Sequence, residues 1–283
     1  MALALTLGLL MGLSLLSGSG HQGFAASWHY FFGAVSVDQA QLQMVITELR
    51  LPRTIAGLMV GASLGVAGTL LQSATRNPLA DTGLLGVNAG AALSIVIGFS
   101  LGLAHSSMDY LLWAFFGALI ANVLVLLMAQ SGSPLRLVLA GVALAATFQG
   151  MTSFLLLSHA SAYEQYRFWI LGSLSGSSFA MIWPLVPVFL LSLIAALMIG
   201  RPLSALLLGD ESARALGYRP VLIRALVALI TTLLSGLAVA LAGPLAFLGL
   251  IAPYLARALT GPRLMQQLVF SALIGAIVLV GAD

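Results

Sequence analysis

The stretch Leu203–Pro220, LSALLLGDESARALGYRP, is the most polar segment in the second half of the chain, and hydrophobic runs lie on both sides of it. Four charged side chains fall close together in it: Asp210, Glu211, Arg214 and Arg219. Glycine commonly ends a helix and proline commonly begins the next one, so a short amphipathic helix closed by Gly217 and stopped by Pro220 fits this pattern. We expect something outside the bilayer to bind this stretch and the flanking segments to move with it.

Composition places the rest of the chain in a membrane. Of its 283 residues, 60% are hydrophobic and only 7% are charged, whereas soluble domains carry about 25% charged residues. We therefore predict a single, all-α, polytopic membrane domain over residues 1–283. All 11 basic residues are arginines, and their spread over loops indicates membrane orientation rather than nucleic-acid binding. The chain has no cysteine, which excludes disulfides, thiolate metal sites and thiol catalysis.

Nine hydrophobic segments are predicted to lie in the membrane, because a span needs about 20 apolar residues and a buried half-helix needs fewer. In chain order they cover residues 2–17, 51–73, 84–103, 110–129, 135–157, 181–199, 221–241, 245–259 and 264–283. Residues 158–179 are expected to form a polar, Ser/Gly-rich connection. Gly57, Gly61 and Gly65 recur at four-residue spacing, which predicts close helix packing inside the subunit or a dimer face.

The arginines favour one orientation. If the chain starts in the cytoplasm and the segments alternate, Arg50, Arg53 and Arg167 fall outside, together with all the histidines. The other arginines then fall inside, which agrees with the positive-inside rule: Arg76, Arg136, Arg201, Arg214, Arg219, Arg224, Arg257 and Arg263. This orientation places Leu203–Pro220 in the cytoplasm. The last segment ends on the outer side, so we expect either a fragment or a final span supplied in another way.

The sequence lacks the motifs of enzymes and of ion-coupled transporters. It has no Walker loop and no HExxH motif, and no histidine is placed to activate Ser153 or the serines of Gly172–Gly176. Ion-coupled transporters usually carry a mid-span acid, but every acid here lies at a loop or helix end. The mid-span polar groups are neutral: Asn88, Asn122, Thr147 and Gln149. They make interhelical hydrogen bonds or line a path for a bulky polar solute, which would need an outside energy source.

The segment Gly209–Gly217 has the properties of a docking element. Asp210 and Glu211 lie near a helix start, where carboxylates suit the helix dipole, and Arg214 is one turn away from Asp210, so the two can pair. Ala213 and Leu216 offer an apolar contact, and Gly217 a C-cap. The alternative interpretation is an ordinary interfacial loop helix.

Further motifs occur in order from about residue 45 to the end. They are LRLPR at Leu49–Arg53, GASLGVAGTLLQ at Gly61–Gln72, RNPLA at Arg76–Ala80 with LGV at Leu85–Val87, LVLAG at Leu137–Gly141, and GPLAFLGLIAP at Gly243–Pro253. With Gly209–Gly217, they resemble the FecCD family, the permease subunits of ABC importers for iron–siderophore complexes, haem and cobalamin. Thr82 replaces a usual proline and Tyr254 a usual histidine, so the role of that histidine cannot be transferred. The family's tenth span is absent, which implies a C-terminally incomplete chain.

The resemblance implies an ABC type II importer permease fold, in a multi-pass subunit of the bacterial cytoplasmic (inner) membrane. It implies a second permease copy, identical or closely related, around a path on the two-fold axis. A dimer of ABC ATPases would hydrolyse ATP, and a periplasmic or lipid-anchored binding protein would deliver the substrate. This chain would itself bind no metal or cofactor and no nucleic acid, and would not be an enzyme.

The resemblance also implies three groups of site residues. Coupling to the ATPase is expected at Gly209, Asp210, Glu211, Ala213, Arg214, Leu216 and Gly217. Docking of the binding protein is expected at Arg50 and Arg53, whose alternative role is to reach lipid headgroups. A cytoplasmic gate is expected at Ser133 and Pro134. An iron–siderophore complex is the favoured substrate, with haem or cobalamin open, and the rival classes are a secondary transporter and a membrane scaffold subunit.

Overall fold

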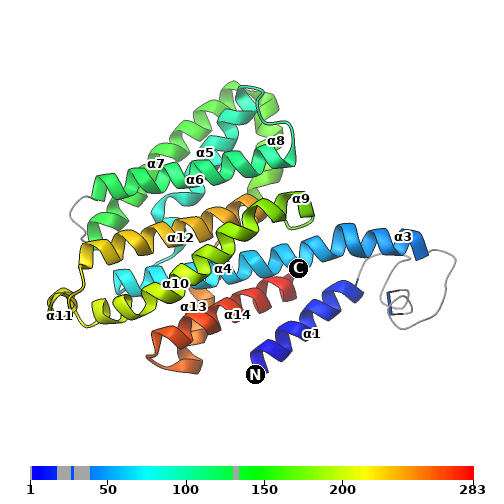
Figure 1. The fold of residues 1–283 in the computed structure, drawn as a ribbon. Helices are drawn as coiled ribbons and strands as arrows, with labels where there is room; N and C mark the ends of the chain where they lie inside the picture. Colours follow the sequence, from blue (N-terminus) through cyan, green and yellow to red (C-terminus); the bar gives the residue numbers. More distant parts are fainter. Residues whose placement is uncertain (1, 18–26, 29–38, 130–133) are drawn as a thin grey trace.

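The protein is a bundle of helices, as seen in a computed structural model that describes residues 2–17, 27–28, 39–129 and 134–283. The long helices run roughly side by side, with α11 at one end of the bundle and α3 and α8 at the other (Figure 1). The elements are α1 (Ala2–Leu16), α3 (Gln39–Met44), η2 (Val45–Arg50), α4 (Leu51–Thr75), η3 (Thr82–Leu85), α5 (Val87–Ser100), α6 (Ser107–Ala129), α7 (Pro134–Ser158), α8 (Ala160–Ile170), α9 (Phe179–Ile182), η4 (Trp183–Leu185), α10 (Val186–Leu207), α11 (Asp210–Ala215), α12 (Pro220–Ala242), α13 (Leu248–Thr260) and α14 (Leu264–Ala282).

Helix lengths separate full spans from shorter helices. Within the described residues, six helices are long and apolar enough to cross a membrane: Leu42–Thr75, Ser107–Val125, Val138–Ser158, Phe179–Leu207, Pro220–Ala242 and Leu264–Ala282. Three shorter apolar helices are α1, α5 and α13. The all-helical fold is thus as predicted, but the expected nine segments are of two kinds. The segment expected at residues 84–103 starts later, at Val87, because the short 3₁₀ helix η3 precedes it.

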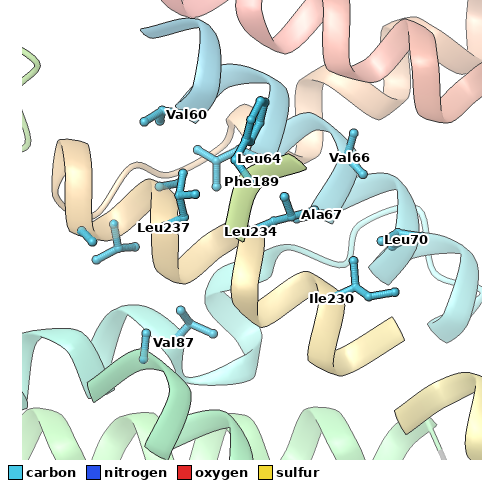
Figure 2. Packing of buried hydrophobic residues seen from close by; sticks show 14 of the residues in the cluster. Val60, Leu64, Val66, Ala67, Leu70, Val87, Phe189, Ile230, Leu234 and Leu237 are labelled. Atoms are coloured by element: carbon cyan, nitrogen blue, oxygen red, sulfur yellow. The ribbon is translucent and has the colours of Figure 1, made fainter. Parts of the chain in front are cut away.

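The core is organised around α4, which packs against α14, α12, α13 and α10. In its span, 89% of the most apolar stretch is buried, which is the largest share among the six spans. Figure 2 shows Leu64, Ala67 and Leu70 of α4 near Leu234 and Ile230 of α12. Burying these side chains inside the bundle removes α4 from lipid, so its neighbours rather than the bilayer fix its position.

Glycines allow the helices around α4 to approach closely. A Cβ atom placed at Gly61 would overlap the Gly275 carbonyl of α14, and one at Gly65 would overlap the Ser271 carbonyl. One at Gly68 would overlap the carbonyl of Gly249 near the start of α13. The predicted packing of this glycine face inside the subunit is therefore confirmed, since its contacts come from the same chain.

The helix α13 begins inside the bundle rather than at its surface. Gly249 contacts Gly68, which lies about 10 Å from the C-terminal end of α4 at 1.5 Å per residue. Phe247, the residue just before α13, has a left-handed backbone (φ 68°), which is rare for a residue with a side chain. The chain therefore enters the bundle from Gly243 as a loop and continues as a short helix toward the C-terminal end of α4. This helix starts at Leu248, three residues later than the expected segment 245–259.

The helix α8 was not expected from the sequence. Residues 158–179 are polar and rich in serine and glycine, yet Ala160–Ile170 form a helix that buries Ala162 and packs against α5 and α7. Ser173 N donates to the Ala242 carbonyl (2.9 Å), so the end of this connection is fixed to the end of α12.

Candidate coupling site and translocation face

The polar stretch Leu203–Pro220 forms a helix–turn–helix–turn unit between two spans. Helix α10 ends at Leu207, and Gly209 takes a backbone with φ 121° that residues with a side chain rarely adopt. Helix α11 then runs over Asp210–Ala215 and closes where Tyr218 N donates to the Ala213 carbonyl (2.9 Å), with Gly217 left-handed at φ 84°. The predicted short helix closed by Gly217 is confirmed.

Asp210 anchors α11 to two other elements. Its carboxylate accepts hydrogen bonds from Arg224 of α12, with Nη2 to Oδ1 at 2.7 Å and Nη1 to Oδ2 at 3.0 Å. Arg76, at the C-terminal end of α4, donates from Nη2 to Oδ1 at 3.2 Å. The expectation that Asp210 pairs with Arg214 is wrong in this structure. Two guanidinium groups on other elements take the carboxylate, because Arg224 offers it a bidentate geometry.

The remaining side chains of α11 divide into an inner and an outer group. Ala213 is fully buried (0% exposed) against the protein itself, so it positions α11 and is not available as an apolar contact for a partner. Leu216 is 61% exposed, and Glu211 and Arg214 are also exposed. The surface offered to a partner therefore combines Ala215 and the larger Leu216 with charges of both signs.

Protonation of Asp210 should loosen α11. The hydrogen bonds from Arg224, followed by the charges of Arg224 and Arg76, hold the pKa of Asp210 below its ordinary value of 3.8, against an opposing effect of burial. A lowered pKa means that the carboxylate stabilises the folded state above pH 3.8 and that this contribution is lost as the pH falls through the folded-state pKa. A spin label at Ala215→Cys should therefore gain mobility under acid, and Asp210→Asn should give high mobility throughout. Mobility in Glu211→Gln should follow the parent protein, and an acid response retained in Asp210→Asn would contradict the assignment.

The outer arginines Arg50 and Arg53 make contacts within the chain. Arg50 Nη1 donates to Ser27 Oγ (2.7 Å) and to the Leu15 carbonyl (2.9 Å). Arg53 forms a bidentate pair with Asp283, with Nε to Oδ2 at 2.5 Å and Nη2 to Oδ1 at 2.8 Å. They lie at the opposite end of α4 from Arg76, about 37 Å away for 25 helical residues. The two groups of arginines thus lie at opposite ends of this span.

The gate expected at Ser133 and Pro134 falls at the edge of the described residues. Ser133 lies outside them, and Pro134 is the first residue of α7. The assignment of a gate to these residues stays a prediction.

Among the mid-span polar groups, Asn122 packs between helices, whereas Thr147 and Gln149 are exposed. Asn122 is buried and donates from Nδ2 to the Ala228 carbonyl of α12 (3.3 Å), which is the interhelical role. Thr147 and Gln149 of α7 are exposed. Only 17% of the apolar stretch of this span is buried. Uncovered polar groups in mid-span are unfavourable toward lipid, so this part of α7 is the candidate path-lining surface.

Thr147 lies on a face of α7 that is otherwise built from small residues, whereas Gln149, two residues on, lies about 200° around the helix. Ala143, Ala146, Thr147 and Gly150 are exposed and recur at i, i+3, i+4 and i+7, which places them on one helix face. A Cβ atom at Gly150 would meet nothing within 4 Å. The face therefore has open space beside it that a solute or a second subunit can occupy.

A polar network beside α13 was missed in the sequence. Gln72 of α4 is buried; its Oε1 accepts from Arg257 Nη2 (2.7 Å), and its Nε2 donates to the Gly249 carbonyl (3.5 Å). Asp81 lies nearby, where burial raises the pKa of its carboxyl and a hydrogen bond from Thr82 N (2.8 Å) opposes that rise. The sequence feature that could have indicated this network is Gln72, a glutamine inside an otherwise apolar helix. In the described part of the chain, no group of three His, Asp or Glu side chains comes together as a metal site.

Comparisons with known proteins agree with one another. A model of the FecCD transport family matches residues 5–283. The chain is 45% identical over 221 residues to the ferric enterobactin transport system permease protein FepD of Escherichia coli (strain K12), covering 77% of this chain and 66% of FepD. It is 39% identical over 275 residues to the Fe(3+)-citrate import system permease protein YfmD of Bacillus subtilis (strain 168), covering 96% and 81%. A solved inward-facing structure described as a metal-chelate type ABC transporter matches with a TM-score of 0.88 at 29% identity, covering 100% of this chain and 88% of the other.

Proposed function

The chain belongs to the FecCD transport family, and we propose that it moves a ferric chelate across a bacterial cytoplasmic membrane. It is a membrane permease subunit of an ABC importer. The relatives FepD and YfmD are described as permeases for ferric enterobactin and Fe(3+)-citrate. A ferric siderophore or ferric citrate is therefore the substrate class favoured for this chain, ahead of haem and cobalamin.

The observation that carries this proposal is α11. It is a short helix between two spans, fixed inward by Asp210 and Ala213 and exposed outward at Glu211, Arg214 and Leu216. A separate ATPase can bind the outer side of such a helix and move it as a rigid body, because its inner side is hydrogen-bonded to α12 and to the end of α4. ATP hydrolysis is assigned to that partner. Alternating access then follows as a change between two packings of the bundle.

The chelate path is assigned to the small-residue face of α7 that carries Thr147, opposite the same face of a second permease copy. A ferric chelate is bulky and polar, so a wide path lined by small and neutral groups fits it better than a tight charged site. On the outer side, Arg53 is 41% exposed despite its pair with Asp283. We assign Arg53 to docking of an acidic surface on the binding protein, with Arg50 beside it as a support.

Reconstitution tests the function and separates it from its rivals. The chain is placed in proteoliposomes with an ABC ATPase and a substrate-binding protein, and radioactive iron is supplied as a ferric siderophore or as ferric citrate. Uptake should require hydrolysable ATP and should persist when ionophores collapse ion gradients. Uptake driven by a proton or sodium gradient would indicate a secondary transporter. Recruitment of a soluble partner without any uptake would indicate a scaffold.

A further inference from the structure

Arg76 joins three elements at the arginine-rich end of the bundle. It lies just after α4, with a left-handed backbone (φ 53°) that turns the chain away from the helix axis. Its Nη2 donates to the Leu206 carbonyl at the end of α10 (2.5 Å) and to Asp210 Oδ1 at the start of α11 (3.2 Å). One guanidinium therefore ties the end of α4 to the span that leads into α11 and to α11 itself.

Arg224 fixes the other side of the same carboxylate. Its side chain is only 13% exposed, and it binds Asp210 through both terminal nitrogens. Its Nε is buried without a hydrogen-bond partner in the described structure. Without Asp210, two cations would face each other at this point, and one of them would be largely shielded from water. We refer to Arg76, Asp210 and Arg224 as the Asp210 triad.

Arg76 also begins a hydrogen-bonded turn that leads into η3 and α5. Asn77 N donates to the Gln72 carbonyl (3.1 Å), Leu79 N donates to Asn77 Oδ1 (3.0 Å), and Ala80 N donates to the Asn77 carbonyl (3.1 Å). Asp81 then accepts from Thr82 N at the start of η3. A displacement of Arg76 is thus passed along a short bonded segment, and Leu79 in that segment is 70% exposed.

We propose that the Asp210 triad transmits movement of α11 to segment 76–85, which makes Arg76 and Asp210 positioning residues for transport. The inference rests on the proposed function, because it takes the ATPase as the source of the movement. By sequence, α11 is joined only to α10 and α12. The triad adds a direct link to the connection between α4 and α5, which lies beside α11 in space but far from it in the sequence.

Arginine suits this link better than lysine. A planar guanidinium holds two acceptors in a fixed geometry, whereas an ammonium on a flexible stem is a mobile point charge. Arg76→Lys should therefore retain the attraction to Asp210 but hold segment 76–85 less firmly. Arg76→Gln should lose the charge and most of the link. If Arg76 had a purely structural role, both variants would lose thermal stability, but the movement of segment 76–85 would not change in this graded way.

The first test uses the isolated permease, without any ATPase. The chain has no cysteine, so nitroxide labels can be placed at Leu79→Cys and Ala215→Cys, two exposed positions on either side of the triad. Their distance distribution should be narrow in the parent protein, broad in Arg76→Gln and intermediate in Arg76→Lys. Arg201→Gln, which removes an exposed arginine of α10, should leave it narrow. An unchanged distribution in Arg76→Gln would overturn the triad as a link, whatever the ATPase does.

The second test adds the ATPase and nucleotide. Addition of ATP should shift the environment of both labels in the parent complex. In Arg76→Gln, the shift at residue 215 should persist while the shift at residue 79 falls to less than half. Equal shifts at both positions in Arg76→Gln would overturn the proposal. An ATPase that never moves the label at residue 215, while the isolated chain behaves as predicted, would instead count against the proposed function.

Discussion

Replacing Gly68 by alanine should strongly destabilise the folded permease, because Gly68 makes the closest backbone approach among the glycines that the structure describes. The new Cβ atom would overlap the Gly249 carbonyl, which belongs to the backbone at the start of α13 and cannot rotate away as a side chain would. Overpacking of this kind costs about 1–3 kcal/mol and occasionally more. Gly68→Val should leave little folded protein. Thermal unfolding of the purified protein in detergent, followed by size-exclusion chromatography, measures the effect.

Gly150→Ala is the matched control, because Gly150 also lies inside a membrane helix but has open space around it. Alanine gains about 1 kcal/mol of helix propensity over glycine. The control should therefore be as stable as the parent or slightly more so, and any loss in Gly68→Ala must come from the overlap. Equal melting temperatures for the two variants would contradict the close approach of α4 and α13. Gly61→Ala, which meets Gly275, should resemble Gly68→Ala.

The fold could be predicted from composition and hydrophobic pattern, because lipid leaves few options for an apolar chain. The spans, the half-helix that begins at Leu248 and the turn at Gly217 all follow from local signals that residues such as Pro220 and Gly243 provide. The two groups of arginines lie at opposite ends of α4, as the hydrophobic pattern indicated, and the assignment of one end to the cytoplasm stays a prediction. Helix α8 was missed, although Ala162, Tyr166 and Trp169 recur at helical spacing and pack against the core, because the polar Ser/Gly-rich composition of residues 158–179 favoured a loop.

The candidate site was only partly predictable, since its key contacts join residues far apart in the chain. The spacing of Asp210 and Arg214 fits an ion pair within one helix, yet the partners of Asp210 are Arg224 and Arg76. Asp210 binds the bidentate Arg224 of another helix rather than Arg214 on its own turn. Spacing within one helix gives no information about such a partner. Likewise, sequence alone could not show that Ala213 faces inward and Leu216 outward, because α11 is too short for a periodic signal.

This division of α11 leads to a prediction with a large effect on transport. Leu216→Asp should abolish chelate uptake while leaving the permease folded. Leu216, the residue just after α11, is the largest apolar side chain on its exposed face. Loss of a central apolar anchor at an interface typically costs about 2 kcal/mol or more, which is about 30-fold in affinity. Binding of the ATPase to the permease in nanodiscs should weaken by at least that factor, with an unchanged melting temperature. Glu211→Arg should weaken binding less, because exposed charges contribute only about 0.2–1 kcal/mol.

Two other variants test whether the effect of Leu216→Asp comes from the outer face of α11. Leu171→Asp makes the same exchange at an exposed leucine just after α8, at the other end of the bundle, and should leave ATPase binding unchanged. Asp210→Asn should behave in the opposite way to Leu216→Asp, because it keeps the outer surface of α11 but loosens its attachment to Arg224 and Arg76. It should bind the ATPase with near-normal affinity yet hydrolyse ATP without matching uptake. Normal ATPase binding by Leu216→Asp, or lost binding in Asp210→Asn alone, would show that the docking surface is not the outer face of α11.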